Sequence, residues 1–323
     1  MLASHWPGAF VLGHTPDRHP EPTRPALTAP ALVPASRLGP WLRRGARGLV
    51  NTAFGPKRAL RVHGMGAAKT GTHTLGEMFA DRVPSAHERD AERLIALLLD
   101  AGPGSPALRR YLQRRDRWRG LQIDASQVNI YLIGDLEALF PDSRYVLTLR
   151  SPAAWLRSMV DDSLRRETSA TWHRFRDFRF GPRAAPDGAR AGGSRADGPE
   201  AALAEAGLYT LDGYLGYWAF AVTEALDRLP ADRLLVLRTE EIGPRAAEIA
   251  RFAAVPDPDR PPRLTHAFRN PWRSGVLSRI DRAYLQDRLA TVCGPAAARV
   301  MPGWTAAADL DRALAAPAPE AGT

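Results

Sequence analysis

Residues 62–75 hold the residue types most able to do chemistry, in the order Val-His-Gly-Met-Gly-Ala-Ala-Lys-Thr-Gly-Thr-His-Thr-Leu. A short apolar run leads into small residues, which lead into a segment with helical spacing. In such a turn, backbone N–H groups point at one spot where an anion is favoured, and a lysine and threonines add further donors. The stretch predicts a phosphate-binding loop. The residues expected to contact the phosphate are Ala68, Lys69, Thr70, Gly71, Thr72 and His73.

Two anion chemistries fit this loop. The P-loop of nucleoside triphosphatases reads G-x-x-x-x-G-K-[ST]; residues 64–70 approach it, with Ala68 in place of the second glycine and one residue fewer before it. Asp124, at the end of an apolar strand, would then hold a magnesium ion. In the second interpretation the lysine precedes the glycine, as Lys69-Thr70-Gly71-Thr72. That order resembles the 5′-phosphosulfate loop of sulfotransferases, whose donor is 3′-phosphoadenosine-5′-phosphosulfate.

A second segment, residues 144–158, favours the second interpretation. A predicted strand ends in Arg150, Pro152 begins a helix, and Ser158 follows eight residues after the arginine. An arginine and a serine converging at a strand end suit a second, separate phosphate. Their types and spacing resemble the 3′-phosphate motif of sulfotransferases, whereas a triphosphatase needs no such site. The resemblance covers roughly residues 60–300.

The resemblance implies a reaction and roles for named residues. A sulfuryl group would pass from 3′-phosphoadenosine-5′-phosphosulfate to a hydroxyl by in-line displacement, releasing adenosine 3′,5′-bisphosphate without a metal. Lys69 would stabilise the leaving group. Glu88 or His87, about as far beyond the loop as the catalytic glutamate of several carbohydrate sulfotransferases, would be the general base. His173 is a third candidate for the base.

The acceptor is predicted only by class, as a small hydroxyl compound such as a phenol or a glycan. Asp124 and Ser126, at the end of a predicted strand, and His173 are the residues expected to bind it. His63, inside the first strand, is expected to be a buried histidine with its hydrogen bonds satisfied. Two alternatives stay open: an ATP- and magnesium-dependent phosphotransferase, and a non-catalytic protein that binds a partner or membrane surface through its basic N-terminal segment.

Strand and helix patterns alternate along the chain. Strands are predicted at 59–65, 120–124, 144–149 and 233–237, with helices at 72–81, from Pro152, at 208–229 and at 244–253. Strands alternating with helices predict an α/β fold, a three-layer sandwich with a central parallel sheet in P-loop nucleotide-binding topology.

Composition limits the class of protein. The chain has 323 residues, 45% of them hydrophobic, and no apolar run long enough to span a bilayer. Cys293 is the single cysteine, which excludes a disulfide framework and favours a cytoplasmic location. Residues 1–60 contribute +6 of the net charge of +9, which argues against a nucleic-acid binder.

The same patterns suggest a domain organisation. Its parts are a disordered proline-rich leader at 1–35, a basic amphipathic helix or linker at 36–58, a sulfotransferase domain at 59–305 with a mobile insertion at 181–200, and a flexible tail at 306–323. Residues 36–54 could contact a membrane surface. The oligomeric state is left open.

Overall fold

The structure is a computed structural model that describes residues 48–165, 168–181, 198–263 and 273–315. All of these residues belong to one compact unit that begins at Gly45. The predicted leader, most of the predicted insertion and residues 316–323 lie outside the described ranges.

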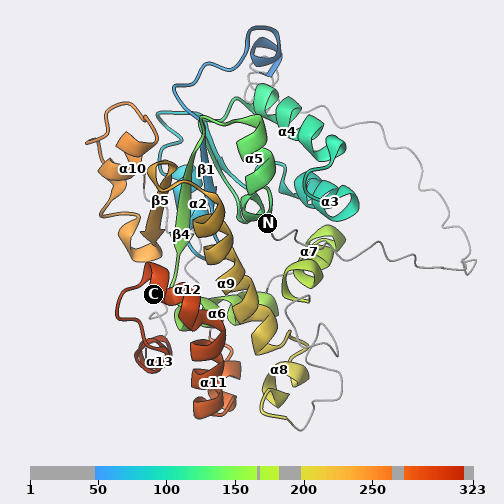
Figure 1. Ribbon diagram of the computed structural model, residues 1–323, viewed down its shortest axis with the longest axis vertical. Coiled ribbons are helices and arrows are strands. Elements are labelled where there is room, and N and C mark those ends of the chain that lie inside the picture. Colours follow the sequence, from blue (N-terminus) through green and yellow to red (C-terminus); the bar gives the residue numbers. More distant parts are fainter. Residues whose placement is uncertain (1–47, 166–167, 182–197, 264–272, 316–323) are drawn as a thin grey trace, which may run out of the picture. The chain divides into compact units, whose positions relative to one another are not determined.

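A five-stranded parallel sheet forms the centre of this unit (Figure 1). Its strands, in spatial order, are β2 (Ser85–His87), β3 (Ile123–Ala125), β1 (Val62–Met65), β4 (Arg144–Leu149) and β5 (Leu234–Arg238). Every neighbouring pair is parallel, and Met65 of β1 lies opposite Leu147 of β4. The predicted α/β fold with a central parallel sheet is confirmed.

Alternation along β4 explains why the sheet is covered on both faces. Tyr145, Leu147 and Leu149 join one cluster of buried apolar residues, whereas Val146 joins a second cluster on the other face. A strand with both faces apolar is stable only between two layers of helices.

Helices form those two layers. The Val146 face packs against α2 (Thr72–Glu77) and α10 (Ala246–Phe252), which contribute Leu75 and Ile249 to its cluster. The opposite face packs with the larger cluster, to which seven longer elements contribute: α3 (Ala91–Ala101), α4 (Pro106–Arg119), α5 (Ile133–Leu139), α6 (Pro152–Arg165), α7 (Ala170–Phe180), α9 (Leu211–Arg228) and α13 (Ala306–Ala315). Shorter elements complete the chain: η1 (Gln127–Tyr131), η2 (Ala231–Arg233), η3 (Thr239–Glu241), η4 (Val276–Arg279), α8 (Ala201–Glu205), α11 (Arg282–Arg288), the π-helical turn η5 (Leu289–Cys293) and α12 (Gly294–Val300).

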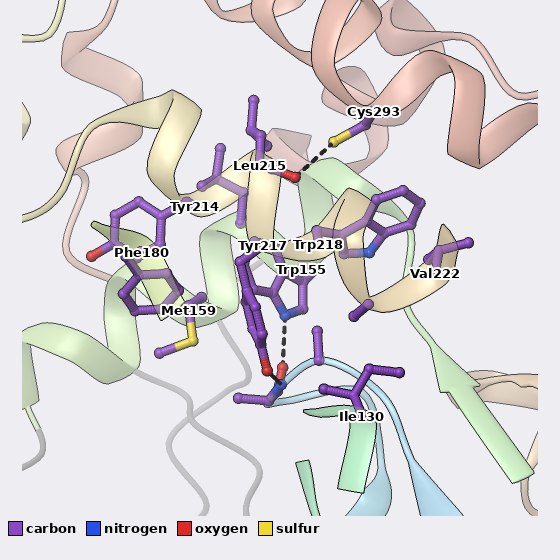
Figure 2. Packing of buried hydrophobic residues seen from close by; sticks show 14 of the residues in the cluster. Ile130, Trp155, Met159, Phe180, Tyr214, Leu215, Tyr217, Trp218, Val222 and Cys293 are labelled. Atoms are coloured by element: carbon purple, nitrogen blue, oxygen red, sulfur yellow. Dashed lines mark hydrogen bonds between the residues drawn. The ribbon is translucent and has the colours of Figure 1, made fainter. Parts of the chain in front are cut away.

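The helix predicted at 208–229 is observed as α9, which runs from Leu211 to Arg228. Thr210 caps the helix by accepting a hydrogen bond from the Gly213 N–H at 3.1 Å. Tyr214 and Trp218 are fully buried, and Cys293 packs on the same helix with its thiol 3.8 Å from the Leu215 carbonyl oxygen (Figure 2). Burial raises the pKa of this thiol far above its usual value, so Cys293 is an apolar core residue.

The predicted flexible tail is wrong for residues 306–315, which form α13. Leu310 and Ala313 are buried, and Asp309 accepts hydrogen bonds from the Ala153 N–H and the Trp304 Nε1–H, each at 2.9 Å. The Asp309 carboxylate thereby caps the first turn of α6. The sequence did not predict this helix, because an alanine-rich segment with few large apolar residues shows no clear helical pattern.

Other boundaries moved by a few residues. The predicted helix 72–81 ends as an α-helix at Glu77 and continues as turns, and the strand at 120–124 runs from Ile123 to Ala125. The edge strand β2 was not predicted, because three residues of sequence Ser-Ala-His carry no strand pattern.

Residues 48–54 are helical and lie at the start of the described chain. Gly48 packs so closely on Trp118 of α4 that a β-carbon there would lie 2.6 Å from the indole. The other side exposes apolar residues: Leu49 is 66% and Phe54 85% exposed. Within the predicted amphipathic segment 36–58, the apolar residues Leu49 and Phe54 therefore face outward. Within the described ranges, no helix has both the length and the apolar character needed to cross a membrane.

Candidate active site at the carboxyl edge of the sheet

The loop between β1 and α2 passes close to the neighbouring strand. Gly66 has φ 146°, and a β-carbon there would overlap the Thr148 carbonyl oxygen of β4. Gly71, with φ 107°, precedes α2, and a β-carbon there would lie 2.5 Å from Ile242. Lys69 also has a positive φ, 67°. Glycine adopts a positive φ without strain, so the glycines at positions 66 and 71 allow the loop to follow this path.

The protein holds the loop by its carbonyl groups. Trp155 Nε1–H donates to the Ala68 oxygen at 2.6 Å, and the Thr239 hydroxyl donates to the Thr70 oxygen at 2.7 Å. Tyr217 approaches from α9, where its hydroxyl accepts from the Ala68 N–H at 3.3 Å; Figure 2 shows Trp155 and Tyr217 reaching the loop.

Four successive backbone N–H groups of the loop remain available to bind a ligand. Those of Lys69, Thr70, Gly71 and Thr72 donate to no acceptor within the part of the chain that the structure describes. Successive N–H groups in such a turn form a concave anion site. The carbonyl groups are fixed by the fold and the N–H groups are available, which is the arrangement a phosphate requires.

The threonine hydroxyls divide between structure and site. Thr70, 1% exposed, donates to the Ala67 oxygen at 2.7 Å and lies 2.8 Å from the Thr148 hydroxyl, so its side chain serves the loop. The Thr72 hydroxyl instead lies 3.1 Å from His87 Nε2. Of the two, the Thr72 hydroxyl is the better placed to meet a ligand.

Lys69 is paired with a carboxylate that the sequence did not single out. Its Nζ lies 3.0 Å from Asp162 Oδ1 on α6, and both side chains are largely buried. The charge of the loop lysine is therefore balanced by a carboxylate of the protein itself.

The two predicted bases lie next to this loop. His87 Nε2 is 3.9 Å from Glu88 Oε1, and the His73 and His87 rings meet edge-on with centroids 5.1 Å apart. Glu88 follows β2 directly and has φ 49°. Its N–H donates to the Ala125 oxygen at 2.8 Å, so this strained backbone is held by the end of β3.

A chain of polar contacts orients Glu88. Gln127 Nε2 donates to Glu88 Oε1 at 2.6 Å, and Arg179 of α7 donates to Gln127 Oε1. Arg179 is itself buried, with its guanidinium over the rings of Phe175 and Phe180. The carboxylate of Glu88 is thus held in one orientation beside the loop.

A second cationic cluster lies beyond the end of β4. Burial and the nearby charge of Arg273 lower the pKa of Arg150, although Glu240 acts in the opposite direction. Burial, Arg273 and Arg150 lower the pKa of Arg157 in the same way. Within the described residues Arg150 makes no side-chain hydrogen bond or ion pair. Asp161, whose carboxylate lies 3.8 Å from Arg273, and Glu240 offset only part of this positive charge, an arrangement that favours a bound anion.

Ser158 lies on α6, one residue after Arg157 and partly buried. Of the predicted pair, Arg150 therefore lies two residues before α6 and Ser158 lies midway along it. Arg157 was missed, because an arginine in this arginine-rich chain carries no distinguishing signal.

The residues predicted to bind the acceptor are not brought to the loop. Arg115 engages both carboxylate oxygens of Asp124, one of them at 2.9 Å, and the pair is buried. Burial alone would raise the pKa of Asp124, but the charge and hydrogen bonds of Arg115 outweigh it and lower that pKa. Asp124 points to the α4 side of the sheet, because it alternates with Ile123 and Ala125 along β3.

Ser126 and His173 have other surroundings. The Ser126 hydroxyl accepts from the Val128 N–H at 3.1 Å and caps η1, while His173 lies exposed on α7.

His63 is buried as predicted, but the expectation that its hydrogen bonds are satisfied is wrong, because neither ring nitrogen has a hydrogen-bond partner. Its ring instead stacks on Phe140 and tilts against Tyr145.

No three His, Cys, Asp or Glu side chains of the described ranges come together in a group that could hold a metal ion.

The solved structures to which the chain is similar include two sulfotransferases. One is a sulfotransferase from Alicyclobacillus acidocaldarius, with 15% identity, a TM-score of 0.42 and coverage of 76% of this chain and 95% of that one. The other is the sulfotransferase domain of the olefin synthase from Synechococcus PCC 7002, with 14% identity, a TM-score of 0.32 and coverage of 82% and 91%. No protein-family profile and no curated protein sequence matches the chain. Both similar structures are described as sulfotransferases, the family that the sequence motifs resemble.

Proposed function

We propose that this protein is a sulfotransferase that moves a sulfuryl group from 3′-phosphoadenosine-5′-phosphosulfate to a hydroxyl acceptor. The supporting observation is a pair of anion sites on neighbouring strands. One is the loop after β1, with its available N–H groups, and the other is the arginine cluster after β4. Because β1 and β4 are parallel neighbours, the segments that follow them lie at the same edge of the sheet, as the two phosphates of one nucleotide require.

The proposed step is an in-line displacement at sulfur. The acceptor oxygen forms a bond to sulfur while the bond from sulfur to the bridging phosphate oxygen breaks. The electron pair of the broken bond leaves with adenosine 3′,5′-bisphosphate, and the acceptor proton passes to Glu88 or His87. Lys69 would leave Asp162 and donate to the bridging oxygen, where negative charge develops.

Glu88 is the favoured base because the protein orients it. The contact from Gln127 fixes one carboxylate oxygen, which leaves the second free to accept a proton. His87 would assist through its contact with Thr72, close to the transferred group.

The alternative of an ATP-dependent phosphotransferase is less favoured, because Asp124, the residue expected to hold its magnesium ion, already has a partner. The Asp124 carboxylate is buried and both of its oxygens are engaged by Arg115. The alternative in which the N-terminal segment binds a membrane or partner rests mostly on residues outside the described ranges.

A lysine pair in the chain allows a clean test of the proposed activity. Lys57 and Lys69 are the only lysines, and Lys57 is exposed. Release of the bisphosphate from 3′-phosphoadenosine-5′-phosphosulfate should depend on an added phenol or sugar and be lost in Lys69→Met. Lys57→Met should retain it. Equal activity in both variants would contradict the proposed role of Lys69.

A further inference from the structure

Arg176 of α7 is a buried cation without a partner. It is 9% exposed, yet among the residues that the structure describes it makes no side-chain hydrogen bond or ion pair. It shares the inward face of the helix with Phe175, Arg179 and Phe180. Its guanidinium nitrogens are not among the buried side-chain atoms that lack a hydrogen-bond partner, so an otherwise buried arginine keeps its charged end within reach of solvent and of a bound anion.

The charges around Arg176 connect it to the candidate active site. Burial and the positive charge of Arg179 lower the pKa of Arg176, and Asp162 acts in the opposite direction. Asp162 is the partner of Lys69, and Arg179 is joined to Glu88 through Gln127. Arg176 is therefore near both sides of the centre where sulfuryl transfer would occur.

Arg179 is held in place, but Arg176 is not. Arg179 donates to Gln127 and lies over three aromatic rings, those of Phe175, Phe180 and Tyr217. The region thus has more positive charge than its own acids balance. A carboxylate, sulfate or phosphate accepts paired hydrogen bonds from a guanidinium, and such charge-assisted bonds are among the strongest.

We propose that the acceptor is an anionic hydroxyl compound and that Arg176 binds its negatively charged group. The inference rests on the proposed function. The donor phosphates already have the loop and the cluster at Arg150, so Arg176 is left for the second substrate. Its neighbours Arg179 and Asp162 connect it to Glu88 and Lys69 respectively, so an acceptor held by Arg176 would lie beside the proposed base and the transferred group.

The test compares acceptors that differ only in charge. Two matched pairs are 4-hydroxyphenylacetate with 4-methylphenol, and glucuronate with glucose. In wild type, kcat/KM should favour the carboxylate in at least one pair by about tenfold or more, the factor expected for a charge-assisted hydrogen bond. Arg176→Gln should remove that ratio, and Arg176→Lys should keep part of it.

Arg174→Gln is the matched control. Arg174 lies on the same helix but is exposed and paired with Asp100 at 2.6 Å, so its loss changes the net charge equally and should leave the ratio as in wild type. The Kd of adenosine 3′,5′-bisphosphate, measured for each variant, reports folding and donor binding. A loss of bisphosphate affinity in Arg176→Gln as large as the loss in ratio would assign Arg176 to the donor and overturn the inference.

Binding without turnover separates this inference from the proposed function. Calorimetric titration of each carboxylate into protein saturated with bisphosphate should show binding that is lost in Arg176→Gln and kept in Arg174→Gln. If the bisphosphate binds but neither carboxylate does, the inference is wrong while the proposed donor stands. If the bisphosphate does not bind, the proposed function fails, and the inference that rests on it fails with it.

Discussion

The ammonium group of Lys69 lies 3.0 Å from the carboxylate of Asp162, which joins the phosphate loop to the helix that follows Arg150. In the proposed function, a nucleotide in the loop would bring its own negative charge to the same ammonium group. Lys69 would then exchange Asp162 for the phosphosulfate, and the Asp162 carboxylate would compete with the donor.

Asp162→Asn should bind adenosine 3′,5′-bisphosphate more tightly than wild type. The change removes a competing negative charge and frees Lys69, and an increase in affinity of about tenfold corresponds to roughly 1.4 kcal/mol. Calorimetry gives the affinity, with Asp142→Asn, at an exposed position, as the charge-matched control. Weaker or unchanged binding in Asp162→Asn would contradict this competition.

Glu88→Gln should abolish most of the transfer while the bisphosphate still binds. General base catalysis contributes about 10²- to 10⁴-fold, so kcat should fall within that range. Glu92→Gln, on the exposed side of α3, serves as control and should retain wild-type kcat. A larger loss in His87→Asn than in Glu88→Gln would move the base to the histidine.

His63 should make the protein sensitive to mild acid. Burial lowers its pKa from 6.5 to about 4, although the charge of Asp124 acts in the opposite direction. The unfolded chain takes up the proton below about pH 6.5 while the folded protein does not, so the free energy of unfolding falls as pH drops toward 4.

Between pH values near 7.5 and 5 this loss amounts to about 2 kcal/mol. Urea unfolding at both pH values measures it. His63→Leu should lose less stability than wild type over the same interval. An identical pH dependence in the two proteins would show that His63 does not contribute to it.

Asp124→Ala should lower the stability of the fold, and not merely weaken binding of the acceptor. Removing one member of a buried ion pair leaves the other uncompensated, at about 3–5 kcal/mol. Replacing Arg115 with Met in the same protein should recover part of this loss, as urea unfolding of the single and double variants will show. A variant with wild-type stability and a raised acceptor KM would restore Asp124 to the acceptor site.

The sequence was sufficient for the elements with strong patterns. Four of the five strands and the loop at Lys69 could be predicted, because apolar strands, glycine spacing and a lysine followed by threonine have local causes. The edge strand β2 and the helix α13 could not. Their apolar content is low, and their stability comes from packing against β3 and α6.

Side-chain partners were harder to predict than elements. Asp124 lies on strand β3 and pairs with Arg115, whereas Asp162 lies on helix α6 and pairs with Lys69. Which arginine meets which acid depends on the packing of α4, α6 and α7, and the chain contains 42 arginines with similar local sequence. The role proposed for Arg176 could not be predicted from the sequence either, since only its burial in the structure distinguishes it from the other arginines.

The most direct test of the account is calorimetric binding of adenosine 3′,5′-bisphosphate, compared with ATP and magnesium, to wild type and Arg150→Ala. We expect wild type to prefer the bisphosphate. Arg150→Ala should weaken its binding by about 10- to 100-fold, the effect of one charge-assisted hydrogen bond. Arg110→Ala, at an exposed position on α4, should change nothing. Preference for ATP with magnesium, indifferent to Arg150, would contradict the assignment of a sulfuryl donor.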